Sequence, residues 1–135
     1  MKLATSHLDR RALLIGTVAA LFAAPAAFAA GRIPFDAAAF QAARDAGQTT
    51  VLEVTAKWCG PCQRQRPVVA KLLEEPDFAK LTVFDADYDL HKVELVRLKA
   101  LQLTTLIIYR GATEIERSSG ETRPEMVRAF LRKAI

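Results

Sequence analysis

The two cysteines of the chain, Cys59 and Cys62, are separated by two residues and are the side chains best suited to chemistry. Two thiols at this spacing can close a short disulfide. When the first one stands at the start of a helix, the amide groups and the partial positive charge there favour its thiolate. Cys59 is therefore predicted to attack a disulfide of another protein, and Cys62 to resolve the mixed disulfide that forms.

The cysteine pair has two alternative interpretations, a structural zinc site and a purely structural disulfide. A structural zinc site needs four ligands, and beyond the leader the chain offers these two thiols and His91, too few without a partner chain. A purely structural disulfide would close so short a loop that it would remove little chain entropy from the unfolded state. Redox chemistry is therefore the favoured interpretation of the pair.

The stretch Lys-Trp-Cys-Gly-Pro-Cys at residues 57–62 resembles the active site of the thioredoxin family, and the resemblance extends over residues 35–135. It implies an α/β thioredoxin-like fold, a central mixed β-sheet flanked by helices. It also implies a thiol:disulfide oxidoreductase that acts on oxidised client proteins and needs no cofactor or metal. Cys59 and Cys62 match the attacking and resolving cysteines, and Trp58, Gly60 and Pro61 are expected to face the substrate.

Glu53 lies six residues before Cys59, where the family commonly has a buried aspartate. In a strand, Val51, Glu53 and Thr55 share one face, so Glu53 is predicted to reach beneath the cysteines. A buried carboxyl has a raised pKa and could exchange a proton with Cys62 through a water molecule. The alternative is an exposed glutamate near a sheet edge. Lys57 is predicted either to add positive charge near the thiolate or to be a solvated surface residue.

The chain departs from the family at Thr104, which stands where a cis-proline usually faces the cysteines. Family members use the backbone before this position to dock an extended substrate, so Leu103 and Thr104 are predicted to bind substrate. The Leu103–Thr104 bond is expected to be trans or to be held cis by its surroundings. Without the proline ring, an alternative function is an iron–sulfur cluster or zinc ion held by Cys59 and Cys62 of two chains.

Periodicity and capping signals predict alternating helices and strands after residue 35. Parallel pairing is expected between strands joined by helices, and an antiparallel hairpin is expected around Gly111.

Several side chains of the predicted helices have an expected role. Phe40 should face inward, and Pro67 should interrupt one backbone hydrogen bond. Apolar contacts should come from Val93, Val96 and Leu101. Asp89 is expected to cap a helix, and Thr122 and Glu125 have capping-box spacing. Helices are predicted over 36–46, 60–73, 91–100 and 123–134, and strands over 49–55, 81–86, 106–110 and 114–118.

The first 29 residues have the pattern of a cleavable signal peptide, which leaves a single domain over 30–135. Residues 1–11 are cationic, residues 12–24 form an apolar run of 13 residues, and Ala27 and Ala29 give a small-x-small cleavage site. An uncleaved membrane anchor is the less favoured alternative, because such a run makes about 20 Å of helix against a hydrocarbon core of about 30 Å.

Arg10 and Arg11 followed by an apolar run resemble a twin-arginine export signal, although a general signal has similar features. Either route predicts action outside the cytoplasm, in a bacterial periplasm. Gly60 and Pro61 resemble the reducing members of the family, so a membrane electron donor or another thiol–disulfide partner is expected.

The net charge of +4 comes partly from the leader, and no basic and aromatic cluster supports nucleic-acid binding. A monomer is expected.

Overall fold

The computed structural model describes residues 30–135, so the predicted leader lies outside the described residues. The described chain begins with a strand and then alternates helices and strands. Its elements are β1 (Gly31–Pro34), α1 (Ala37–Asp45), β2 (Thr49–Thr55), α2 (Gly60–Leu73), η1 (Pro76–Phe78), β3 (Thr82–Asp87), α3 (Lys92–Arg97), β4 (Thr105–Arg110), β5 (Thr113–Ser119), α4 (Pro124–Leu131) and η2 (Arg132–Ala134).

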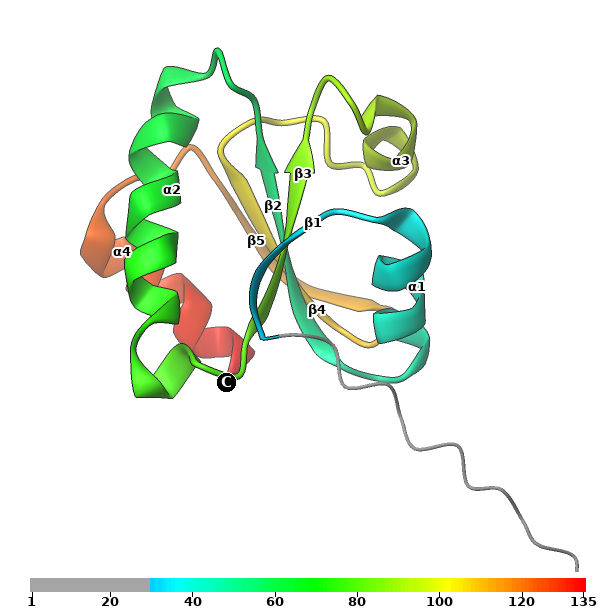
Figure 1. The fold of residues 1–135 in the computed structure, drawn as a ribbon, viewed down its shortest axis with the longest axis horizontal. Coiled ribbons are helices and arrows are strands. Elements are labelled where there is room, and N and C mark those ends of the chain that lie inside the picture. The colour runs from blue at the N-terminus through cyan, green and yellow to red at the C-terminus, as the bar shows by residue number, and fades with distance from the viewer. Residues whose placement is uncertain (1–29) are drawn as a thin grey trace, which may run out of the picture.

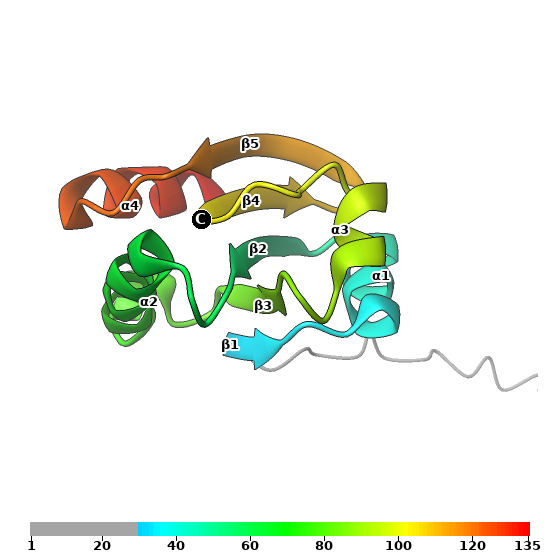
Figure 2. The same ribbon diagram turned by 90° about the horizontal axis from the view of Figure 1, so that it is seen from above.

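A five-stranded mixed sheet with the order β1-β3-β2-β4-β5 forms the middle layer. β3 pairs in parallel with both β1 and β2, whereas β4 runs antiparallel to β2 and to β5. Helices α2 and α4 cover one face of the sheet and α1 and α3 cover the other (Figure 1). Figure 2 shows the same three layers from above. The mixed sheet flanked by helices that the sequence predicted is therefore confirmed.

The central strand β2 separates two apolar cores because its side chains alternate between the faces of the sheet. Val51 points towards α2 and α4 and packs with residues such as Val69 and Phe130. Leu52 and Val54 point the other way, into a cluster with aromatic residues of α1 and β3. Phe40 of α1 is buried in this second core, as predicted. Both faces of β2, the strand that leads to the cysteines, are thus covered by apolar side chains.

The hairpin between β4 and β5 turns at Gly111, where the backbone conformation and the close neighbours favour a glycine. Gly111 has a φ of 56°, in the left-handed region, and a Cβ built there would lie 3.3 Å from the carbonyl oxygen of Arg44. Its amide donates to the carbonyl of Gln48 at 2.9 Å. A side chain at Gly111 would therefore disturb the contact between this hairpin and the end of α1.

The structure corrects the predicted helix ends in two places. Thr122 and Glu125 do not form a capping box, because Arg123 is the N-cap of α4 and makes no side-chain cap bond. The carboxylate of Glu121 accepts the amide hydrogens of Thr122 and Arg123 instead. Similarly, Asp89 does not cap α3, whose N-cap is His91.

The predicted inward face of α3 is also wrong, because the helix is shorter than expected. Only Leu95 of this helix is buried, whereas Val93, Val96 and Leu101 are exposed. A helix of six residues has less than two turns and can direct only a narrow stripe at the sheet. Among residues 30–135, no helix combines the length and the apolar character that crossing a membrane requires.

Candidate functional site

The two cysteines form a disulfide at the N-terminus of α2. Cys59 is the N-cap residue, and its Sγ accepts the amide hydrogen of Cys62 at 3.3 Å. Cys62 is fully buried, whereas Cys59 is 6% exposed, so Cys59 is the more accessible of the two cysteines. The backbone geometry thus provides a hydrogen-bond donor and a helix N-terminus for a thiolate at Cys59, as the spacing predicted.

Gly60 and Pro61 open α2 and are both exposed. Proline suits this first turn because its missing amide hydrogen would have no partner within the helix. A Cβ built at Gly60 would come no nearer than 3.8 Å to its neighbours, so packing does not require a glycine there. Pro67 lies inside the same helix.

Trp58 stands at the rim of the site, with 65% of its surface exposed. Its Nε1 donates a hydrogen bond to a carboxylate oxygen of Asp89 at 2.8 Å, and its ring meets that of Tyr88 edge-on. These two contacts fix the indole while leaving it open to solvent. An aromatic ring that is exposed, yet oriented by these two contacts, is suited to contact a substrate beside the reactive sulfur.

Thr104 lies against both sulfur atoms. Its Oγ1 is 3.4 Å from the Sγ of Cys59 and 3.2 Å from the Sγ of Cys62, and the residue is 3% exposed. Leu103 packs beside the cysteines and Ala56. No peptide bond in residues 30–135 is cis, so the Leu103–Thr104 bond is trans. The structure therefore brings both predicted substrate-binding residues of this loop to the disulfide.

A threonine in place of the proline was expected to leave room for a metal centre beside the cysteines. The Thr104 side chain itself fills this space. The hydroxyl occupies the space next to both sulfurs, and Cys62 is fully buried. Within the described part of the chain, no group of three or more His, Cys, Asp or Glu residues is placed to hold a metal. The site geometry thus favours thiol chemistry over the cluster-binding alternative.

Glu53 is fully buried, so the alternative of an exposed glutamate near a sheet edge is wrong. Arg32 of β1 donates to both carboxylate oxygens, from Nε at 2.8 Å and from Nη2 at 3.0 Å. The same Nη2 also donates to the carbonyl of Arg66 in α2 at 3.0 Å. Burial raises the pKa of Glu53, while the charge and hydrogen bonds of Arg32 oppose that rise.

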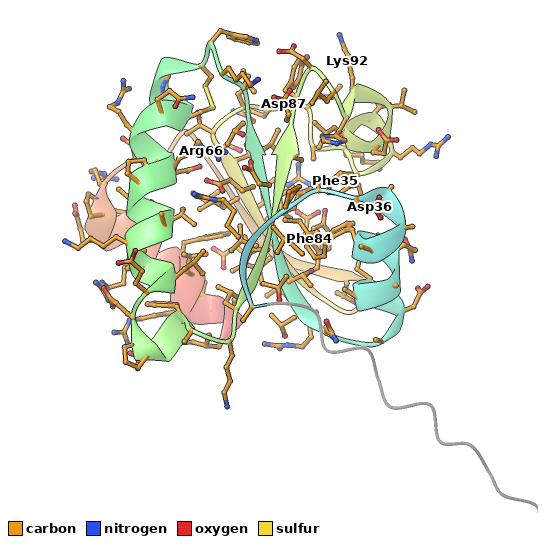
Figure 3. All side chains as sticks on the ribbon, viewed as in Figure 1. Phe35, Asp36, Arg66, Phe84, Asp87 and Lys92 are labelled. Atoms are coloured by element: carbon orange, nitrogen blue, oxygen red, sulfur yellow. A yellow bond between two sulfur atoms is a disulfide. The ribbon has the colours of Figure 1, made fainter. Side chains whose placement is uncertain are left out.

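A second ionic group lies between α2 and the ends of β2 and β3. Arg66 donates to Asp85 at 2.7 Å and to the hydroxyl of Thr55 at 3.1 Å, and Figure 3 labels this arginine beside the sheet. The hydrogen bond to Asp85 raises the pKa of Arg66. A pocket at this point also includes Lys57 and Asp87 in its lining. Lys57 is exposed, as expected of a surface lysine.

Three residues of this site were not found from the sequence. Arg32 and Arg66 are dispersed basic residues without a motif, and their acidic partners lie 21 and 19 residues away. Gln65 is fully buried in α2 and donates to the backbone carbonyls of Thr104 and Glu121. A fully polar amide on the inward face of a helix is the one signal that could have identified Gln65.

Comparison with known proteins agrees with this geometry. The family model described as Thioredoxin matches residues 33–133. The chain is 32% identical to a thioredoxin H-type of Fagopyrum esculentum over 88 residues, which cover 65% of this chain and 74% of that protein. It is 39% identical to a putative thioredoxin-5 of Dictyostelium discoideum over 74 residues, 54% of this chain and 70% of that protein.

Two solved structures have a similar fold and detectable sequence similarity. The crystal structure of Trxlp from Edwardsiella tarda EIB202 has a TM-score of 0.71 at 36% identity, covering 75% of this chain and 98% of that one. The crystal structure of thioredoxin from Trypanosoma brucei brucei has a TM-score of 0.67 at 26% identity, covering 80% and 94%.

Proposed function

This chain belongs to the thioredoxin family, and we propose that it reduces disulfides of exported proteins outside the cytoplasm. Thioredoxins are thiol–disulfide oxidoreductases that act on protein disulfides, and Cys59 and Cys62 give this chain the same dithiol. The observation that carries the activity is the disulfide at the start of α2, whose Cys59 sulfur accepts the Cys62 amide hydrogen at 3.3 Å. The direction and the compartment are the proposed part.

The reaction cycle begins with the reduced protein. The Cys59 thiolate attacks one sulfur of a client disulfide, and the other client sulfur leaves as a thiolate that takes a proton. Cys62 then loses its proton and attacks Cys59 in the mixed disulfide. The second client sulfur leaves as a thiol, and the Cys59–Cys62 disulfide remains. Two electrons and two protons pass to the client, so the protein must be reduced again by another thiol–disulfide partner.

We assign the proton transfer at Cys62 to Glu53. The carboxyl is buried on the face of β2 that points towards α2, and burial raises its pKa. Arg32 links it to the carbonyl of Arg66, which lies one turn beyond Cys62 in α2. A water molecule would connect the carboxyl to the sulfur. A carboxyl with a raised pKa is better matched to a thiol as a proton acceptor than an ordinary solvated one.

The client is expected to approach over Trp58, Gly60 and Pro61. All three are exposed, and they are neighbours in sequence of Cys59, the more accessible of the two cysteines. The backbone of Leu103, next to the sulfurs, is the candidate for docking the client chain. Because these contacts are apolar or made by the backbone, they would accept many client sequences, and specificity would come from access to the client disulfide.

The reducing direction is proposed from Gly60 and Pro61, which resemble the reducing members of the family. It is tested by a redox titration of the protein without its leader in glutathione and dithiothreitol buffers, followed by Trp58 fluorescence and thiol counting. A reduction potential of about −270 mV would support a reductant, whereas a value of about −120 to −180 mV would indicate an oxidant or isomerase. A reductant in this compartment would depend on a membrane electron donor.

Export is proposed from the pattern of residues 1–29. The described domain opens with β1 at Gly31, so cleavage after Ala29 would leave all of its strands intact. Fractionation of bacteria that express the full chain should place the shortened protein in the periplasm, with Ala30 as its first residue. Replacing Arg10 and Arg11 with lysines should block export if the twin-arginine route is used. Retention of the full-length chain in the membrane would instead support the anchor.

A further inference from the structure

Thr104 has an unusual backbone conformation that places its hydroxyl on the two reactive sulfurs. Its φ is 54°, in the left-handed region, which β-branched residues adopt only rarely because the side chain crowds the backbone. The residue is nevertheless 3% exposed and well enclosed. A residue keeps an unfavourable backbone conformation only when the surrounding structure holds it there. Residues held in this way are concentrated at functional sites.

Neighbouring elements hold Thr104 in place from both sides. Its carbonyl accepts the amide hydrogen of Gly120 at 2.8 Å and lies 3.4 Å from the donating side-chain nitrogen of Gln65. The next residue, Thr105, shares a hydrogen bond at 2.8 Å with the hydroxyl of Ser119. The end of β5 and helix α2 therefore fix the loop, and the position of the Thr104 hydroxyl follows from these contacts.

The direction of the contact with sulfur follows from the chemistry of the disulfide. Neither sulfur of a disulfide carries a proton, so the hydroxyl of Thr104 must be the donor at 3.2 Å and 3.4 Å. It has a single proton to share between the two sulfurs. In the reduced protein a thiolate at Cys59 is a much better acceptor, because a hydrogen bond to an ionised group is about twice as strong as a neutral one.

We propose that Thr104 is a catalytic residue whose hydroxyl donates a hydrogen bond to whichever cysteine sulfur carries the negative charge. It stabilises the Cys59 thiolate before attack, and the Cys62 thiolate when that sulfur attacks the mixed disulfide. No bond to Thr104 is made or broken. Since the thiolate gains more than the disulfide, the hydroxyl shifts the equilibrium towards the dithiol and makes the protein a milder reductant. The inference rests on the proposed exchange at these cysteines, but not on its direction.

The test compares variants with and without the hydroxyl. Thr104→Val removes it while keeping the shape of the side chain, and Thr104→Ala and Thr104→Ser form a second pair that differ in the hydroxyl alone. Thr50→Val is the matched control, because it removes the hydroxyl of a buried threonine in β2 that makes no side-chain hydrogen bond in the described structure and is not part of the Thr104 loop. The pH dependence of Cys59 alkylation gives its pKa, and equilibration with glutathione gives the redox constant.

Loss of the hydroxyl should raise the pKa of Cys59 by about one unit. It should also shift the redox constant about tenfold towards the disulfide, which corresponds to about 30 mV. Thr104→Ser and Thr50→Val should remain close to the unaltered protein. The proposal is overturned if Thr104→Val behaves like the unaltered protein and Thr104→Ala like Thr104→Ser. A different result, no reduction of insulin by the unaltered protein with dithiothreitol, would contradict the exchange function itself.

Discussion

Arg32, whose side chain is partly exposed, and the buried Glu53 form an ion pair beneath the active-site helix, in which the guanidinium donates to both carboxylate oxygens. The arginine comes from the edge strand β1, and the glutamate from the central strand β2, with β3 between them. The pair therefore spans three strands. It also connects the first described strand to the carboxyl that is proposed to move the proton of Cys62.

Glu53 should make the stability of the protein fall as the pH rises. Its pKa in the folded protein is raised above the ordinary 4.5, mainly by burial, so the folded state keeps the proton longer than the unfolded state. The free energy of unfolding should therefore decrease from about pH 4.5 through the raised pKa and then level off. For each pH unit by which the folded pKa exceeds the unfolded one, the free energy of unfolding falls by about 1.4 kcal/mol over this range. Guanidinium unfolding across this pH range should show the decline, and Glu53→Gln should remove it.

Arg32→Met provides a second variant for the same window. Removing the charge that opposes the rise should move the pKa of Glu53 higher and extend the decline to higher pH. A decline that persists in Glu53→Gln would assign it to another group. In single-turnover kinetics, Glu53→Gln should also slow the attack of Cys62 by about 100-fold or more, because general base catalysis typically contributes about 10² to 10⁴ in rate.

The two cysteine variants should separate the steps of exchange. Cys59→Ser should abolish reduction of client disulfides, because the attacking sulfur is lost. Cys62→Ser should form mixed disulfides that accumulate, because no second thiol can release the client. Non-reducing gels of protein mixed with an oxidised client should show the trapped species for Cys62→Ser alone. Normal turnover by Cys62→Ser would refute the two-thiol cycle.

Replacing Lys99 with glycine should stabilise the protein by about 1 kcal/mol. Lys99 has a φ of 52°, a conformation that costs a residue with a side chain about 1–2 kcal/mol. It follows the C-cap of α3, where the amides of Lys99 and Ala100 bond to the carbonyls of Val96 and Leu95. Glycine is the usual residue at this position. Chemical unfolding measures the gain, and Lys99→Ala, which keeps the Cβ, should show none.

Glu121 should contribute stability that is lost in acid. Its pKa is lowered to about 2, first of all by the hydrogen bond from the Arg123 side chain. Because the folded pKa is below the unfolded one, the contribution is fully present above about pH 4.5 and disappears as the pH falls towards 2. Glu121→Gln should therefore reduce stability at pH 6 and flatten this acid-induced decline. Glu125→Gln is the matched control, four residues further along the chain, and it should leave the loss of stability in acid unchanged.

The sequence predicted most of the alternating elements because their signals are local. β2 and α2 were predicted with the same bounds that the structure has, since a β-branched run and a capped helix are read within one stretch of chain. Strand β1 was missed. It has four residues, with Gly31 at its start and Pro34 at its end, so it lacks the alternation that marks a strand. It exists because β3 offers a parallel partner, which the local sequence cannot show.

The cysteine pair and the buried Glu53 were singled out from the sequence, whereas the contacts that surround them were not. Cys59, Cys62 and Glu53 stood out because a dithiol spacing and a charge in an apolar strand are rare. The partners of Glu53 and of Thr104 depend on how distant elements pack, so neither Arg32 nor Gln65 could be assigned to them. The left-handed conformation of Thr104 was equally hidden, because a β-branched residue would normally be expected in an extended one.

The two edges of the described sheet, β1 and β5, carry the features that protect natural proteins from aggregation. β1 has only four residues, and Pro34 has no amide hydrogen to offer another strand. β5 carries the charges of Glu114, Glu116 and Arg117. Short edge strands, prolines and charges discourage the addition of a further strand. Neither edge is thus a favourable template for a strand of another copy of this chain or of a bound client.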